Sequence, residues 1–168
     1  MKLIENNSYV SNEKFVKFLV KAKKATYASG AKPDTLSGGE CGFYFQEEDL
    51  TYYDIYRDRR YRAGGELLSC DSGVFWILNY HGGIITLPDE FAITADQVFS
   101  FLRKALMNIS EEIPFRGPTF FKEGLWRYTH WWMKNATGFN GYEAVWYGPN
   151  DLYKVKIYEL HFHCGSLV

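Results

Sequence analysis

The sequence has little of what would indicate export, membrane insertion or a strong electrostatic partner. It contains three cysteines, Cys41, Cys70 and Cys164, without a CxxC spacing. This odd number favours free thiols in a reducing compartment over a disulfide framework. The longest apolar run, Val74 to Leu78, has five residues, whereas a membrane-spanning helix needs about 20. The net charge of −1 gives no general attraction to nucleic acid or anionic lipid. We therefore expect a cytoplasmic protein without membrane contact.

Aromatic residues, by contrast, are abundant. Phe, Trp and Tyr make up 18% of the 168 residues, with 13 Phe, 13 Tyr and five Trp. Aromatic side chains favour strands and bury large areas, so a strand-rich core accounts for many of them. A surface that binds a ligand is the alternative use for such rings, and the composition leaves both open.

Two segments have the apolar spacing of amphipathic helices. Apolar residues recur at i, i+3, i+4 and i+7 in each, first at Phe15, Phe18, Leu19 and Ala22, and then at Val98, Phe101, Leu102 and Ala105. The second segment follows Thr94-Ala95-Asp96-Gln97, which has the form of a capping box. The sequence therefore predicts helices that begin near Asn12 and after Thr94.

Alternating residues between these helices indicate strands. We expect them near 50–57, 66–70, 74–81, 125–133, 143–147 and 153–163, with shorter strands at 43–45 and 120–121. Asp71-Ser72-Gly73 and residues 148–151 are turn sequences, so the strands that flank each of them should form hairpins. Short links imply antiparallel pairing.

Similar residues recur in the same order in both halves of the chain. Phe18-Leu19-Val20-Lys21-Ala22 matches residues 101–105, and Gly64-Gly65-Glu66 matches residues 141–143. We therefore expect one α+β domain over 1–168, with two pseudo-symmetric repeat units at about 12–83 and 94–165. Each unit would be a helix followed by three or four antiparallel strands, with the helices packed on one face of the sheet.

Four segments resemble a bacterial family known only as a domain of unknown function. They are residues 25–30, residues 49–56, Phe75-Trp76-Ile77-Leu78-Asn79-Tyr80-His81-Gly82 and Phe115-Arg116-Gly117-Pro118. Glu48 and Arg62 depart from the family pattern, which prefers glycine and an aromatic residue there. Some members are fused behind a Cro/repressor-type helix-turn-helix, so the resemblance implies a module that accompanies transcription factors. It supplies no catalytic residue or cofactor. No helical segment precedes Asn12, and direct DNA binding by this chain is not expected.

The expected strand faces bring polar and aromatic residues together. Tyr52, Asp54 and Tyr56 share one face, and the matching strand carries Tyr128, His130 and Trp132. Asn79, His81 and His161 lie near the ends of the last strands. Ionisable groups on an aromatic face are costly to bury unless they are paired or bind a ligand. We predict that these nine residues line one pocket. Glu66 and Glu143 are a further matched pair that could gather in this pocket. The structural alternative is that strand ends at the rim of the sheet are polar and hydrated, and that Glu66 and Glu143 orient turns.

Three functions fit this pattern. The first is a small-molecule-binding or sensory domain with an aromatic-lined pocket. The second is an enzyme that uses a His/Asp/Glu cluster for acid–base chemistry on a small substrate. The third is an interaction module whose aromatic faces form a homodimer. His161 and His163 could grip a metal ion from one strand face, but paired strand histidines are more often surface residues, and we assign no metal. The sequence names neither the ligand nor a reaction.

Overall fold

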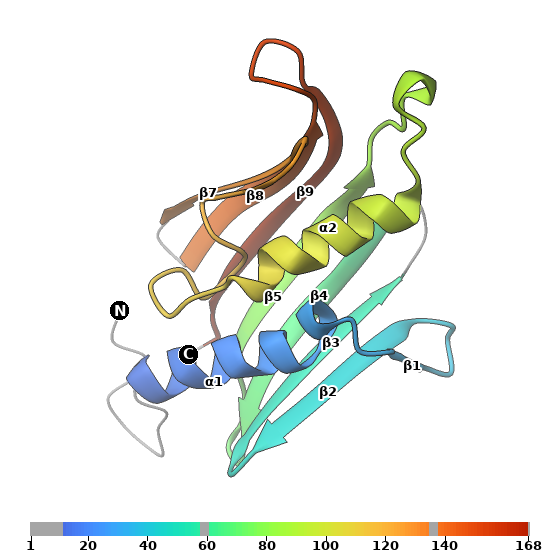
Figure 1. Ribbon diagram of the computed structural model, residues 1–168. Coiled ribbons are helices and arrows are strands. Elements are labelled where there is room, and N and C mark those ends of the chain that lie inside the picture. The colour runs from blue at the N-terminus through green and yellow to red at the C-terminus, as the bar shows by residue number, and fades with distance from the viewer. Residues whose placement is uncertain (1–11, 58–60, 135–137, 168) are drawn as a thin grey trace.

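The computed structural model describes residues 12–57, 61–134 and 138–167. These residues form two α-helices, two short 3-10 helices and nine strands (Figure 1). The helices are α1 (Asn12–Ala25) and α2 (Ala95–Met107), and the 3-10 helices are η1 (Tyr27–Ser29) and η2 (Asp89–Phe91). The strands are β1 (Asp34–Thr35), β2 (Cys41–Glu47), β3 (Leu50–Arg57), β4 (Tyr61–Cys70), β5 (Gly73–Ile84), β6 (Phe120–Glu123), β7 (Trp126–Lys134), β8 (Gly138–Tyr147) and β9 (Val155–Ser166).

All nine strands belong to one antiparallel sheet, in the order β1-β2-β3-β4-β5-β9-β8-β7-β6. The central pair joins β5 to β9, with His81 opposite His161 and Leu78 opposite Cys164. Outward from this pair, each strand of the sheet pairs with its neighbour in sequence. The two edge strands are short, which leaves few unpaired backbone groups for another chain to extend.

The predicted fold class is wrong. The structure is one large, strand-dominated sheet rather than two helix-plus-strand repeats. The similar residues report local structure: amphipathic spacing produces a helix and a turn sequence produces a hairpin wherever each occurs. The pairing of β5 with β9 joins residues that are far apart in sequence, and local patterns do not specify it.

The predicted helices and most predicted strands are present. Thr94 is the N-cap of α2: its hydroxyl accepts from the Gln97 amide N–H, and the Gln97 side chain accepts from the Thr94 N–H. Strand β3 has the predicted bounds, whereas β4, β5, β8 and β9 extend beyond theirs. The 71–73 turn joins β4 to β5, as expected.

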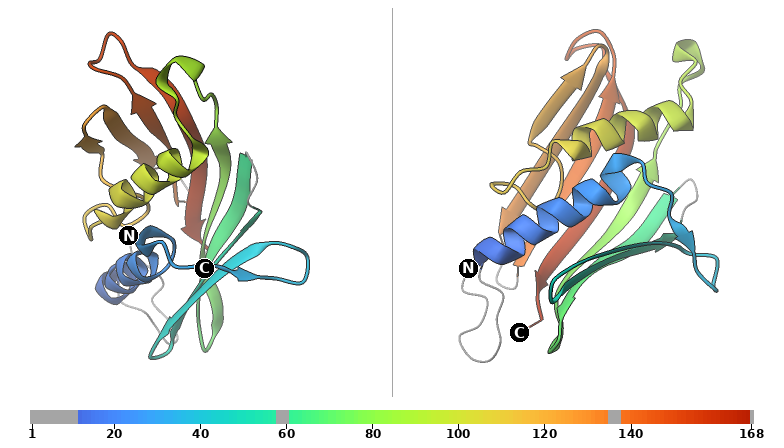
Figure 2. Two further views of the ribbon diagram at one scale, coloured as in Figure 1. Left: turned by 45° about the vertical axis from the view of Figure 1, so that its right-hand side comes forward. Right: turned by 60° about the horizontal axis from the view of Figure 1, so that its bottom comes forward.

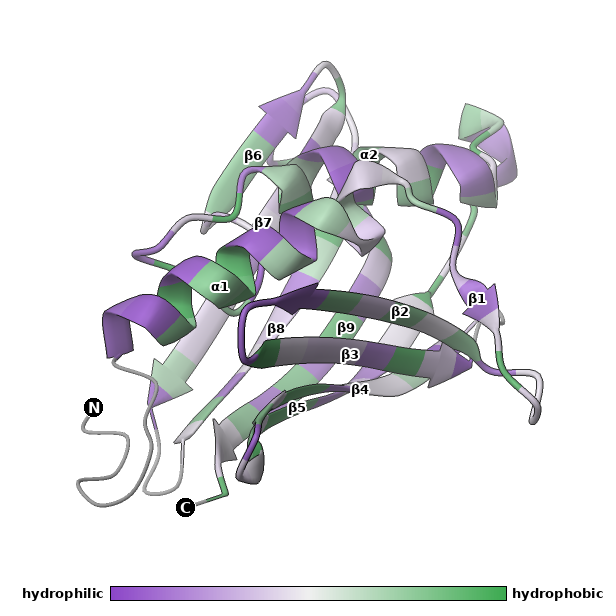
Figure 3. Cartoon of the chain, turned by 90° about the horizontal axis from the view of Figure 1, so that it is seen from below, coloured by the Kyte–Doolittle hydropathy of each residue, from purple (hydrophilic) through white to green (hydrophobic). Residues whose placement is uncertain are grey.

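One hydrophobic core includes residues of both helices and of the sheet. From α1 it takes Phe15 and Leu19, from α2 Val98 and Leu102, and from the sheet residues such as Trp76. The sheet curves around the two helices, which lie side by side (Figure 2). Alternating hydropathy along α1 reflects its one buried face (Figure 3). We call the side of the sheet toward the helices its inner side and the opposite side its outer side.

The described residues bear on two expectations from the sequence, one about the cysteines and one about membrane-spanning helices. Cys41, Cys70 and Cys164 are free thiols, and Cys164 is buried. Burial raises the pKa of the Cys164 thiol to about 12. Within the described ranges, no helix has the length and apolar character needed to cross a membrane.

Candidate functional site

Two cationic and two anionic side chains are buried together between the helices and the inner side of the sheet. They are Lys23 from α1, Glu66 from β4, Arg116 from the segment 108–119, and Glu143 from β8. We call these four residues the charge cluster. None of the four is more than 9% exposed. Burial of a charge is costly unless the charge is paired and hydrogen-bonded, so their contacts decide what the cluster can do.

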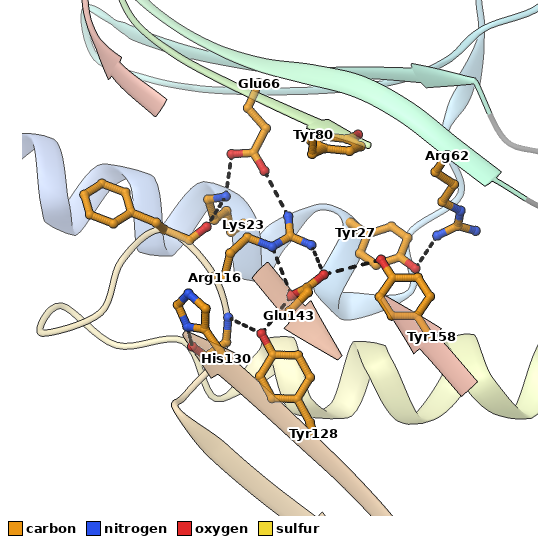
Figure 4. Close-up of polar contacts among 12 residues, drawn as sticks. Lys23, Tyr27, Arg62, Glu66, Tyr80, Arg116, Tyr128, His130, Glu143 and Tyr158 are labelled. Carbon is orange, nitrogen blue, oxygen red and sulfur yellow. Dashed lines mark hydrogen bonds and ion pairs between the residues drawn. The ribbon is translucent and has the colours of Figure 1, made fainter. Parts of the chain in front are cut away.

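Arg116 is the centre of the cluster (Figure 4). Its Nε donates to Glu143 Oε2 at 3.1 Å, its Nη2 donates to Glu143 Oε1, and its Nη1 lies 3.5 Å from Glu66 Oε1. Lys23 donates to Glu66 Oε2 and to the Phe115 carbonyl, the latter at 2.9 Å. The two cations and the two carboxylates of the cluster therefore neutralise one another's charge and hydrogen-bond to one another.

Tyrosine hydroxyls complete the surroundings of Glu143. Tyr128 donates to Oε2 at 2.7 Å and accepts from the Gly117 N–H at 3.1 Å, while Tyr158 donates to Oε1 at 3.4 Å. Burial alone would raise the pKa of the Glu143 carboxyl, but Arg116 and the bond from Tyr128 outweigh it, and the pKa lies below its usual range. Glu143 is therefore held as a carboxylate in a fully buried position.

Asp54 is a fifth ionisable group on the same inner side. It lies directly opposite Glu66 in the β3–β4 pair, and its Oδ1 accepts from the Tyr80 hydroxyl at 2.6 Å. Burial and the nearby Glu66 raise the pKa of Asp54 to about 7, although the bond from Tyr80 opposes the shift. Among the described residues, no cation lies within ion-pairing distance of this carboxyl. Asp54 is therefore divided between its neutral and charged forms near neutral pH.

A small cavity adjoins these groups. Its charged walls are Asp54, Glu66, Lys23 and Arg116, and its remaining walls include Tyr27, Tyr52 and Phe115. The space open to the centres of water molecules is about 30 Å³, and one water needs about 10–15 Å³. The cavity as it stands has room for about two waters.

The predicted site residues are divided between the two sides of the sheet. Tyr52 and Asp54 line the cavity. Tyr56, Tyr128 and His130 are also buried on the inner side, and Trp132 packs against the core. The other three, Asn79, His81 and His161, are exposed on the outer side. The structure thus brings Tyr52 and Asp54 together at the cavity, and a ligand-binding role for any of the nine stays a prediction.

His130 has an unusual polar environment. Its Nδ1 lies 2.9 Å from the Gly117 carbonyl, to which it donates, and this leaves Nε2 as an acceptor. Nε2 is buried, and no hydrogen-bond partner for it is found among the described residues. Burial lowers the pKa of His130, which favours the neutral ring. His130 and Asp54 do not hydrogen-bond to each other, so they form no carboxylate–imidazole pair for acid–base chemistry.

The outer side carries a row of rings across five strands. Trp131 lies opposite Tyr142, Tyr142 opposite His161, and His161 opposite His81. The His81 ring in turn lies nearly parallel to the Tyr61 ring, with centroids 6.4 Å apart. In the part of the chain that the structure describes, no group of three His, Cys, Asp or Glu side chains could hold a metal ion.

Two members of the charge cluster escaped the sequence analysis. Lys23 follows Leu19 by four residues and so lies on the apolar stripe of α1, a position where a lysine is out of place. Arg116 belongs to one of the segments that carry the family resemblance, but it had no assigned role. Glu66 and Glu143 were considered, either as pocket residues or as residues that orient turns, and their contacts with Arg116 were not foreseen.

Comparisons with known proteins identify a family but no activity. Residues 54–167 match a domain of unknown function, DUF5680. This match includes Asp54, Glu66, Arg116 and Glu143, but not Lys23. A search of curated proteins found no match. A search of solved structures found none either. Because the match covers more than half of its length, the chain belongs to the DUF5680 family.

Proposed function

We propose that this domain binds a small polar molecule in the cavity beside the charge cluster and acts as a sensory domain. The observation that carries the proposal is the position of Asp54, a buried carboxyl without a cationic partner, in the wall of that cavity. Buried ionisable groups with perturbed pKa values in a concave site are typical of binding sites. A purely structural cluster has no need of this fifth group.

The irregular segment 108–119, which forms part of the cavity wall, supports a sensory role. Phe115 and Arg116 form part of that wall and belong to the segment 108–119, which is in neither helix nor strand. Arg116 also joins Glu66 of β4 to Glu143 of β8, two strands separated in the sheet by β5 and β9. A ligand that displaces Arg116 would therefore change contacts on both sides of the central strand pair. Such a coupling turns ligand binding into a change of shape.

The expected setting of the family fits this role. We further propose that the protein is bacterial and cytoplasmic, and that some of its relatives are fused C-terminal to helix-turn-helix regulators. In such an arrangement the domain would report a metabolite to the regulator, and it would not itself read DNA.

Thermal-shift screening against a metabolite library tests the proposal, because a ligand that binds only the folded state raises the melting temperature. The matched variant is Ala28→Leu, which adds side-chain volume at the cavity wall. It should abolish the ligand-induced shift, whereas Ala63→Leu on the exposed outer side should preserve it. The proposal fails if no compound raises the melting temperature, or if Ala28→Leu folds and responds as the wild type does.

A second candidate function is pairing with another copy of the chain through the outer side. The observation in its favour is the row of rings Trp131, Tyr142, His161, His81 and Tyr61, next to which Glu159 lies 2.8 Å from His161 Nε2. Aromatic enrichment with few charges is typical of the centre of a protein interface. This function and ligand binding use opposite sides of the sheet, so both can hold.

A further inference from the structure

Among the described residues, no cation is in direct contact with Asp54. Lys23 and Arg116 supply two positive charges, and Glu66 and Glu143 already neutralise them through direct contacts. Arg62 is a third buried cation on the inner side, and it donates to the Tyr27 hydroxyl and lies over the rings of Tyr27 and Phe99. His130 adds no positive charge, since burial favours its neutral ring. An ionised Asp54 is therefore a buried carboxylate without a contacting cation among the described residues, and a proton or an added cation would stabilise it.

The geometry leaves part of the Asp54 carboxyl open to a ligand. Tyr80 occupies Oδ1, and Oδ2 has no hydrogen-bond partner among the described residues. The opposite position on β4 is Glu66, a like charge that offers no donor. A group that donates to Asp54 from the cavity therefore meets no competing protein donor at Oδ2.

The uncharged walls suit a cation as well. Tyr27, Tyr52 and Phe115 line the same cavity as Asp54, and the guanidinium of Arg62 already lies over the Tyr27 ring, 5.3 Å from its centroid. The faces of aromatic rings attract cations through their quadrupole, and the attraction increases when water is excluded. An anion in this place would face the carboxyl groups of Asp54 and Glu66, and Lys23 and Arg116 are already held by Glu66 and Glu143.

From these observations, we propose that the ligand carries a protonated nitrogen, and that this nitrogen binds the carboxylate of Asp54. The ligand class is thus a small organic amine. This inference rests on the proposed function, because it assigns the chemistry of the same cavity. On binding, the proton of a neutral Asp54 passes to the solvent, and the positive charge of the ligand takes its place.

The probes are methylammonium chloride and ethanolammonium chloride, with sodium acetate and methanol as the anionic and neutral controls at equal ionic strength. The melting temperature of the wild type should rise by a few degrees with the two amines and stay constant with the controls. Calorimetric titration at pH 7 in two buffers of different ionisation enthalpy should show release of a fraction of a proton per amine bound, since burial keeps part of the Asp54 carboxyl protonated there. Asp54→Asn should lose both effects, and Asp49→Asn at an exposed aspartate should keep them.

The amine proposal can be tested even if Asp54→Asn does not fold. If Asp54→Asn fails to fold, the carboxyl carbon resonance of Asp54 in the wild type decides: its titration midpoint must fall to lower pH with methylammonium present, and an unchanged midpoint overturns the proposal. An equal amine response in Asp54→Asn also overturns it. If a neutral or anionic library compound binds in an Ala28-dependent way while amines do not, the proposed function stands and the amine assignment falls. If neither library nor amines bind, both fall.

Discussion

Arg116 holds Glu143 through two parallel hydrogen bonds, Nε to Oε2 at 3.1 Å and Nη2 to Oε1. The pair is buried, and its arginine comes from an irregular segment while its glutamate comes from β8. A bidentate contact of this kind constrains the position of both side chains. It thereby anchors the segment 108–119 to the inner side of the sheet, at the wall of the cavity.

Arg116→Met should be strongly destabilising. The substitution leaves Glu143 buried without its cation, and breaking one partner of a buried ion pair costs about 3–5 kcal/mol. The free energy of unfolding from urea denaturation measures this loss. Lys104→Met is the control, because it removes an ion pair to Glu123 whose side chains are both about half exposed, and such pairs contribute about 0–1 kcal/mol. Equal losses in the two variants would contradict a structural role for the Arg116–Glu143 pair.

Gly117→Ala should also destabilise the fold, for a steric reason. A Cβ at Gly117 would lie 2.9 Å from Cε1 of Tyr128, closer than side chains approach one another. The same glycine donates to the Tyr128 hydroxyl and accepts from His130, so it has little freedom to move away. We expect a loss of about 1–3 kcal/mol by urea denaturation. Gly42→Ala would meet only the exposed side chain of Leu36, at 3.3 Å, and should cost clearly less.

Much of the local structure could be predicted from the sequence, because the signals are local. The capping box at Thr94 and the spacing of Phe15, Phe18 and Leu19 report contacts within a few residues of each other. Strand β3 alternates so regularly that Tyr52 and Asp54 were placed on the same face. For the same reason Tyr52 and Asp54, which line the cavity from β3, were among the predicted site residues.

The sheet and the charge cluster could not be predicted, because they depend on pairings between distant residues. His81 and His161 were expected to face the pocket. Alternate residues of β5 and β9 point to opposite sides of the sheet, and these two histidines lie on the outer side while Tyr80 and Phe162 face inward. A shift of one residue in such a strand exchanges the two faces. Arg116 lies in a segment without any periodic signal, and only its contacts with Glu66 and Glu143 reveal its role.

Pairing through the outer side predicts a concentration-dependent dimer. Trp131→Glu places a charge in the row of rings, where the residue is about half exposed, and desolvating that charge in an interface should abolish association. Sedimentation velocity over a range of protein concentrations measures the change. Tyr153→Glu, at an exposed tyrosine in the β8–β9 turn, is the control and should sediment as the wild type does. A wild type that is monomeric at every concentration, or a dimer that survives Trp131→Glu, would contradict this function.

Asp54→Asn should alter how stability depends on pH. The pKa of Asp54 is about 7 in the folded protein, against an ordinary value of 3.8. Between about pH 4 and pH 7, therefore, the folded state holds a proton that the unfolded state has lost. The free energy of unfolding falls as the pH rises through this window, by at most about 1.4 kcal/mol per pH unit. Asparagine removes this titration and can still accept from Tyr80 through its Oδ1.

The variant should therefore gain stability relative to the wild type as the pH rises from about 4 to 7, and the difference should level off above that. Over the whole window the gain is on the order of 4 kcal/mol at most. Urea denaturation of both proteins at several pH values measures the difference, in which the other titrating groups largely cancel. Asp49→Asn is the control: the pKa of this exposed aspartate is lowered by Lys14, so its removal should give a small change of opposite sign. A difference between Asp54→Asn and the wild type that is constant with pH would mean that Asp54 is already ionised and paired in the folded protein. The cavity would then have no vacant place for an amine.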